Sequence, residues 1–149
     1  MSNAARTDGE EISALILRYA ERIDAGDFGG MATLFEHAVL RTDGHPEVRR
    51  GTDEVRTLYE AMVRLYDGRP STQHVTTNVQ VEVAPDGQSA QARSVYTVFQ
   101  ARPDLPLQPI IGGRYHDSFA RGPDGWHFTE RIIFVDLVGD LSRHLRRAI

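Results

Sequence analysis

The sequence contains no cysteine and no lysine among its 149 residues. The absence of cysteine excludes disulfide bonds, thiolate nucleophiles and metal sites with cysteine ligands. The absence of lysine excludes Schiff-base chemistry and lysine general bases, since arginine supplies all 17 basic side chains. A catalytic mechanism for this chain must therefore use other side chains.

Long apolar runs are also missing. No stretch approaches the roughly 20 apolar residues that span a bilayer, and residues 1–11 lack the apolar core of a signal peptide. The net charge of −4 argues against nucleic acid as a partner, because phosphate binding needs a basic face. We therefore expect a cytoplasmic, single-domain protein that binds neither membrane nor nucleic acid.

The first half of the chain has helical periodicity. Apolar residues over 12–23 recur at helical spacing, after an expected N-cap at Asp8 and before a stop at Gly26. Another helix is expected after Gly51, with Thr52 as its cap. Shorter elements are expected at 31–35 (one or two helical turns) and 39–42 (a strand).

The second half changes to the alternation of strands, expected over 73–83, 90–101, 110–121 and 126–137. Along the first of these strands, even-numbered residues from His74 onward should share one face and odd-numbered residues the other. Three prolines indicate a loop or an edge segment over 102–109. The ends are expected to be a loose tail over 1–7 and, over 139–149, a short arginine-rich helix or a frayed tail.

Helices followed by long strands predict the α+β class. We expect the N-terminal helices to pack on one face of a strongly curved antiparallel sheet, in one domain that covers 1–149 with its core at about 10–137.

Asp24 and His74 form the pair with the most direct chemistry. Asp24 falls at the end of the first expected helix, and His74 at the start of the first long strand. A carboxylate that holds a histidine in one tautomer makes that histidine a general base near neutral pH. Alternatively, Asp24 terminates a helix and His74 is a hydrogen-bonded core residue.

The chain resembles SnoaL-like proteins of the nuclear transport factor 2-like superfamily over about 10–137. The resemblance implies a cone-shaped α+β barrel with a pocket at its open end, and a homodimer or homotrimer. It is carried by the segments 19–27, 34–35, 51 with the helix that follows, 72–78, 92–94, 112–115 and 125–131.

Within that superfamily the pattern is most similar to the branch of scytalone dehydratase, a bile-acid dehydratase and hexachlorocyclohexane dehydrochlorinase. Those enzymes abstract a proton with a histidine that an aspartate orients, and the matching residues here are His74 and Asp24. The chain departs from them elsewhere. Phe99 falls at about the place of scytalone dehydratase's second histidine, and Tyr19 where the dehydrochlorinase has a lysine.

Five further residues are candidates for substrate binding: Tyr19, Asn78, Tyr96, Tyr115 and Arg131. The phenols can donate to a developing enolate oxygen, and Asn78 to a carbonyl, but each can equally serve packing or satisfy the backbone. Arg131 can bind an anion or pair with a carboxylate as scaffold. Alternation from Phe128 places it on the outer face unless a bulge intervenes.

Neither a metal nor a cofactor is predicted. His116 and Asp117 do not form a metal motif, and no glycine-rich phosphate loop is present. The leading hypothesis is a cofactor-independent lyase or isomerase, dehydratase-like, acting on a small apolar or aromatic ligand with a carbonyl group. The alternatives are a non-catalytic binding or subunit-pairing module and, last, an epoxide hydrolase.

Overall fold

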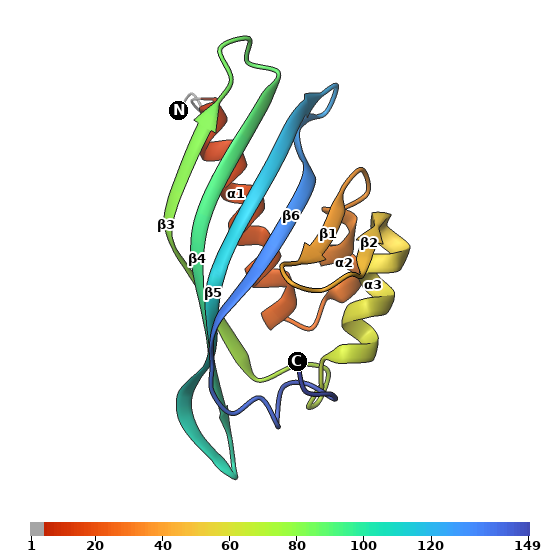
Figure 1. Cartoon of the computed structure of the whole chain (residues 1–149), viewed down its shortest axis with the longest axis vertical. Helices are drawn as coiled ribbons and strands as arrows, with labels where there is room; N and C mark the ends of the chain where they lie inside the picture. Colours follow the sequence, from red (N-terminus) through yellow and green to blue (C-terminus); the bar gives the residue numbers. More distant parts are fainter. Residues whose placement is uncertain (1–4) are drawn as a thin grey trace.

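The computed structural model describes residues 5–149, in which a curved sheet of six strands wraps around three helices (Figure 1). This confirms the α+β class and the curved sheet. The strand order is β2-β1-β6-β5-β4-β3, and only β1 and β6 pair in parallel. The elements are α1 (Asp8–Asp24), α2 (Phe28–Thr33), β1 (Val39–Thr42), β2 (Val48–Arg50), α3 (Gly51–Met62), β3 (Thr72–Val83), β4 (Ser89–Arg102), β5 (Leu105–Gly122) and β6 (Gly125–Val138).

Thr7, and not Asp8, caps the first helix. The Thr7 hydroxyl accepts a hydrogen bond from the backbone N–H of Glu10, and the Glu10 carboxylate accepts one from the N–H of Thr7. The carboxylate of Asp8 instead accepts hydrogen bonds from Arg121 and Trp126. The predicted loose tail over 1–7 is therefore wrong at Thr7, and residues 1–4 lie outside the described part of the chain.

The chain leaves α1 at Gly26, as expected. Its φ is +77°, and an added Cβ would lie 1.9 Å from the carbonyl oxygen of Gly68. Gly44 is a matched control, because its φ is +81° but nothing lies within 4 Å of an added Cβ. We expect Gly44→Ala to lower the free energy of unfolding by about 1 to 2 kcal/mol, the cost of the left-handed conformation. Gly26→Ala should lower the free energy of unfolding, measured in denaturant, by clearly more than Gly44→Ala does. Equal losses of stability in the two variants would contradict this account.

The second and third helices begin differently from the prediction. Asp27 caps α2 by accepting a hydrogen bond from the N–H of Gly30. Thr52 does not cap α3: the N-cap is Arg50, whose N–H donates to the carboxylate of Glu54. The short strand β2, which immediately precedes α3, was not predicted.

The hairpin of β4 and β5 extends past the rest of the sheet (Figure 1). Residues 105–109 pair with β4 alone, because β6 ends at Val138 opposite Ile111. Proline is tolerated there, since no neighbouring strand needs its missing N–H. Of the two alternatives for 102–109, the edge segment is the one found.

Asn78 interrupts the alternation of β3. It adopts φ +52°, and the pairing with β4 shifts register between Thr77 and Gln80. One extra residue reverses every later side chain. His74 therefore faces the interior before the bulge, whereas Val79 and Val81 pack against the core after it. The single alternation predicted over 73–83 is wrong for this reason.

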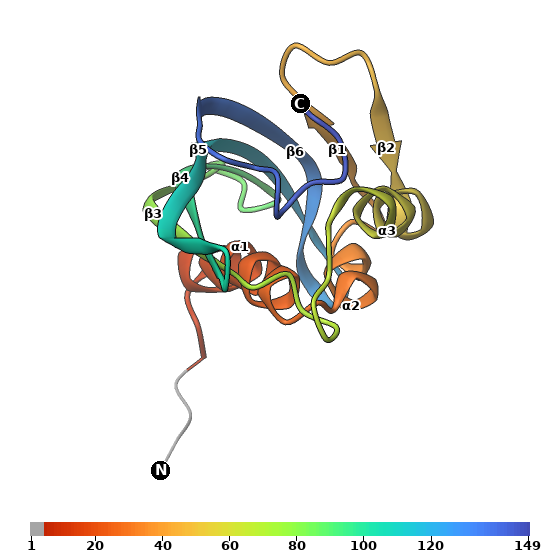
Figure 2. The ribbon, with the colours of Figure 1, turned by 90° about the horizontal axis from the view of Figure 1, so that it is seen from below.

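Residues 139–149 form neither the predicted helix nor a frayed tail. The segment crosses the open end of the fold, between the sheet and α3 (Figure 2). Leu145 forms a bridge with Val63, and the N–H of Arg64 donates to the carbonyl of His144. The segment therefore closes part of the interior that the sheet and helices surround.

Apolar side chains from the helices and from the concave face of the sheet form the core. Its members with no exposed surface are Ile12, Ile16, Met31, Ala32, Phe35, Val55, Ile110 and Phe128. Among the helices of residues 5–149, none combines the length and apolar character needed to cross a membrane.

Candidate active site

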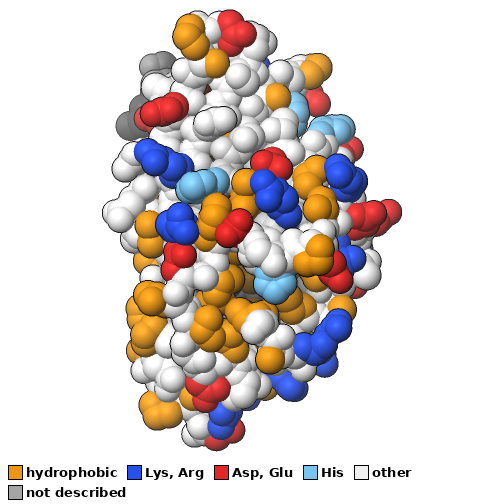
Figure 3. Space-filling view, in the orientation of Figure 1, with side chains coloured by type: hydrophobic (Ala, Val, Ile, Leu, Met, Phe, Trp, Pro, Cys, Tyr) orange, Lys and Arg blue, Asp and Glu red, His pale blue; other side chains and the backbone are white. Residues whose placement is uncertain are grey.

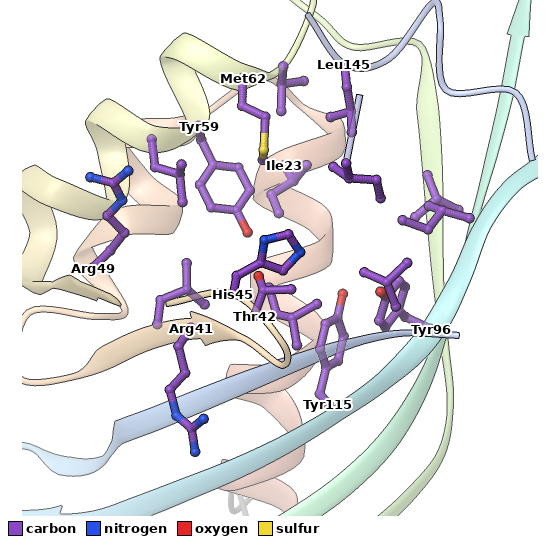
Figure 4. A pocket seen from close by; sticks show the side chains of 18 of the residues that line it. Ile23, Arg41, Thr42, His45, Arg49, Tyr59, Met62, Tyr96, Tyr115 and Leu145 are labelled. Carbon is purple, nitrogen blue, oxygen red and sulfur yellow. The ribbon is translucent and has the colours of Figure 1, made fainter. Parts of the chain in front are cut away.

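A cavity of about 260 Å³ lies between α1, α3, the concave face of the sheet and the C-terminal segment (Figure 4). On the surface, a hollow is bordered by hydrophobic side chains and a histidine (Figure 3). Much of the cavity wall is aliphatic, from residues that include Ile23, Leu40, Leu58, Met62, Val98 and Ile133. The polar residues of the wall include four tyrosines and three histidines: Tyr19, Tyr59, Tyr96, Tyr115, His45, His74 and His144.

Asp24 and His74 are hydrogen-bonded to each other. The distance between Asp24 Oδ1 and His74 Nδ1 is 2.6 Å. The Asp24 carboxylate also accepts hydrogen bonds from the backbone N–H of His74 at 2.7 Å and from the Thr72 hydroxyl at 2.9 Å. These bonds fix the carboxylate against the first residues of β3, so that its orientation does not depend on a ligand.

The contact with Asp24 sets the tautomer of His74. A carboxylate accepts hydrogen bonds, so Nδ1 carries the proton and the lone pair lies on Nε2. Within residues 5–149 no hydrogen bond engages Nε2, and the ring lines the cavity. This is the geometry of a base facing a small-molecule site, and the catalytic role remains a prediction.

Tyr19 and Tyr59 share a hydrogen bond between their hydroxyls on another part of the wall. Both side chains are buried, at 3% and 5% exposed. Burial raises the pKa of both phenols, that of Tyr59 strongly, so both stay protonated at neutral pH. One hydroxyl hydrogen is used within the pair, and the other is left to donate to a ligand. Tyr59 was not among the predicted site residues.

Tyr96 and Tyr115 stack on neighbouring strands, with ring centroids 4.4 Å apart, and both line the cavity. The Tyr96 hydroxyl donates to the carbonyl of Phe134 at 2.8 Å. Burial raises the pKa of both phenols. Tyr96 therefore mainly supports the wall, whereas no hydrogen bond within residues 5–149 engages the Tyr115 hydroxyl.

Arg131 faces the interior because a bulge in β6 intervenes between it and Phe128. Its guanidinium binds both carboxylate oxygens of Asp117, at 2.8 and 2.9 Å, and both side chains are fully buried. It also lies over the rings of Tyr19 and Tyr115. Arg131 does not line the cavity, so it has the scaffold role and not that of a ligand contact.

Asn78 does not belong to the cavity. It is the exposed residue of the β3 bulge, and the bulge turns it away from the face that carries His74. Phe99 also lies outside the cavity lining, whereas Val98, which is opposite His74 in the ladder, is part of it. The ladder thus provides no second imidazole beside His74.

The C-terminal segment contributes His144, a second imidazole on the cavity wall that was not among the predicted site residues. The residue is 7% exposed and lines the cavity. Burial, together with repulsion from His74, lowers its pKa to about 4. The signal in the sequence was the spacing of Leu141 and Leu145, which frames His144 with apolar residues. His45, on the β1–β2 loop, is the third cavity histidine (Figure 4).

Within residues 5–149, no group of three or more histidine, aspartate or glutamate side chains is placed to hold a metal ion.

A family model described as SnoaL-like domain matches residues 4–132. A variant of Rv3472, a protein of unknown function from Mycobacterium tuberculosis, has a TM-score of 0.69 and 27% identity, covering 85% of this chain and 70% of its own. ActVI-ORFA from Streptomyces coelicolor has a TM-score of 0.69 and 20% identity, and the match covers 85% of this chain and 95% of that protein. A Novosphingobium aromaticivorans protein provisionally assigned as a scytalone dehydratase has a TM-score of 0.69 and 19% identity. The match covers 87% of this chain and 84% of that protein. No curated protein matches the sequence.

Proposed function

We propose that this chain, which belongs to the SnoaL-like domain family, is a cofactor-independent lyase or isomerase. It removes a proton from the carbon next to a carbonyl group in a small, mostly apolar molecule. The observation that carries the proposal is the hydrogen bond of 2.6 Å between Asp24 and His74, on the wall of an apolar cavity. The structural likeness to a provisional scytalone dehydratase supports the fold alone, at 19% identity.

In the proposed mechanism, His74 Nε2 takes the proton and Asp24 stabilises the imidazolium that forms. The electrons of the broken C–H bond move onto the carbonyl oxygen, giving an enolate. A hydroxyl of the Tyr19–Tyr59 pair, or that of Tyr115, donates to this oxygen. In a dehydration, the C–O bond on the next carbon then breaks, and the leaving hydroxide receives the proton from His74 to form water.

The cavity supports a compact, largely apolar substrate. Its volume of about 260 Å³ lies just below the range of about 300 to 1,000 Å³ for drug-sized ligands. Aliphatic and aromatic walls favour a ring system over a charged metabolite. Arg41, Glu47 and Arg49, from β1, β2 and the loop between them, supply charge to the lining.

Epoxide hydrolysis has less support. It requires an arginine and carboxylates around a water that meets the ligand, whereas Arg131 and Asp117 bind each other outside the cavity lining.

A non-catalytic binding module is favoured by the apolar walls alone. It predicts that a ligand binds unchanged and that His74→Gln binds it equally well.

The test measures turnover of a panel of mono- and bicyclic β-hydroxy ketones, and the absorbance of the enone product monitors the reaction. We expect at least one member to be dehydrated by the wild type and not by His74→Gln. Binding of the ketones without turnover, in the wild type and the variant alike, would favour the binding module.

Replacing Tyr59 with phenylalanine is expected to lower kcat by about 10²-fold, toward the lower end of the range for loss of one oxyanion donor. The ring and its packing remain, and only the hydroxyl is lost. Tyr96→Phe is the comparison, because the Tyr96 hydroxyl is already bonded to the Phe134 carbonyl. A larger loss in Tyr96→Phe than in Tyr59→Phe would contradict the assignment of the donor.

A further inference from the structure

We propose that His144 is a second functional imidazole, which hydrogen-bonds the hydroxyl that leaves the substrate as water. The inference rests on the proposed function, in which His74 is the base. It assigns the leaving-group role to a residue of the C-terminal segment, far in sequence from the strands and helices that carry the other polar groups of the cavity.

The backbone holds His144 in place from several sides. Its own carbonyl accepts from the N–H of Arg64, and its N–H donates to the carbonyl of Leu141. On one side of it, the Gln100 amide and the Tyr66 hydroxyl both donate to the carbonyl of Arg143. On the other side, Leu145 forms its bridge with Val63. The ring is therefore positioned by the fold and not by a free chain end.

Neither ring nitrogen of His144 has a hydrogen-bond partner within residues 5–149. Nδ1 is fully buried, whereas Nε2 keeps accessible surface, and the residue lines the cavity. Buried polar atoms are almost always hydrogen-bonded, and an exception calls for a reason. A substrate oxygen in the cavity can meet Nε2, the ring nitrogen that is not fully buried.

The charges around His144 favour a neutral donor. His74 and Asp24 are the titratable groups whose charges act on it. The Arg64 guanidinium is bonded to the carbonyl of Leu145, and that of Arg143 to Asp104 and Asp140. Burial and the repulsion from His74 lower the pKa of His144 to about 4. It is therefore neutral at pH 7, with one N–H that can donate.

The proton balance of the elimination is complete with His144 neutral throughout. His74 Nε2 takes the proton from carbon, the C–O bond breaks, and the departing hydroxide takes that same proton from the His74 imidazolium. His144 keeps its own proton and stabilises the oxygen while negative charge develops on it. Two facing imidazolium cations are never required.

The test compares a β-hydroxy ketone with the β-chloro ketone of the same skeleton, because chloride leaves without needing a hydrogen-bond donor of this kind. We expect His144→Phe, which keeps the ring volume but has no polar hydrogen to donate, to slow loss of water by about 10²-fold, as for other preorganised donors, and to leave loss of chloride nearly unchanged. His144→Gln, whose amide N–H can still donate, should lose less. His37→Gln is the matched control, because His37 is exposed and outside the cavity.

The outcomes separate the two claims. If His74→Gln abolishes both eliminations and His144→Phe slows both equally, the role of His144 is overturned and the base stands. If His74→Gln leaves both rates intact, the proposed function itself fails.

A second readout needs no substrate. In NMR titrations of the imidazole signals, the pKa of His144 should rise in His74→Gln, because a facing positive charge is removed. His37→Gln should not move it. An unchanged pKa in His74→Gln would show that the two rings do not face each other across the cavity, and would overturn the inference.

Discussion

Replacing His74 with glutamine is expected to lower the rate of elimination by about 10² to 10⁴-fold, the usual loss when a general base is removed. Glutamine is polar and of similar size, but it cannot take a proton from carbon. Substrate binding should be largely retained, because the apolar walls that supply it are untouched. The measurement is kcat from enone absorbance, with ligand affinity from calorimetry on the same variants.

Variants of Asp24 and of the remote His37 serve as the coupled variant and the control for this prediction. Asp24→Asn should also lower kcat, because an amide can donate to Nδ1 and so favour the wrong tautomer. Since the two residues act as a unit, the double variant should be little slower than His74→Gln alone. His37→Gln should match the wild type. Additive losses in the double variant, or full activity in Asp24→Asn, would contradict a coupled dyad.

Replacing Asp117 with alanine is expected to destabilise the fold by about 3 to 5 kcal/mol, the usual cost of removing one partner from a buried ion pair. Arg131 would be left fully buried without the carboxylate that binds it through two hydrogen bonds. Burial raises the pKa of the Asp117 carboxyl, and the guanidinium of Arg131 opposes that rise. The measurement is the free energy of unfolding in denaturant at pH 7.

An exposed pair of the same geometry provides the control for Asp117→Ala. Arg114 binds both carboxylate oxygens of Asp136 at 2.8 and 3.0 Å, and its guanidinium lies over the ring of Phe134. Because both side chains are about 40% exposed, Asp136→Ala should cost no more than about 1 kcal/mol. Similar losses in the two variants would show that burial does not set the cost of breaking the inner pair.

Periodicity predicted the elements whose pattern runs without interruption. The apolar stripe over 12–23 became α1, which ends before Gly26, and the turn before Gly125 ends β5, both as expected. It failed where one inserted residue changes the register. The bulge at Asn78 moved that residue out of the site, and the bulge before Arg131 moved that residue into the core. Such bulges depend on pairing with a neighbouring strand, which a local pattern does not contain.

The chemistry of a carboxylate and an imidazole singled out Asp24 and His74, and the resemblance supplied the long-range information that they meet. The two residues lie 50 positions apart in the sequence, so a local pattern does not show their contact. Tyr59 looked like one more apolar position on a helix, and its contact with Tyr19 depends on how α1 and α3 pack. His144 was missed because the final residues were interpreted as a helix or a tail, whereas their hydrogen bonds to Met62 and Arg64 close the cavity.

The most direct test of the proposed base is deuterium exchange in D₂O at the carbon next to the carbonyl of a bound cyclic ketone that has no leaving group. Exchange requires proton removal alone, and so does not depend on the leaving-group chemistry. The account predicts exchange catalysed by the wild type and a loss of about 10² to 10⁴-fold in His74→Gln. A ketone that occupies the cavity without exchanging, or that exchanges equally fast in the variant, would contradict the assignment of His74 as the base.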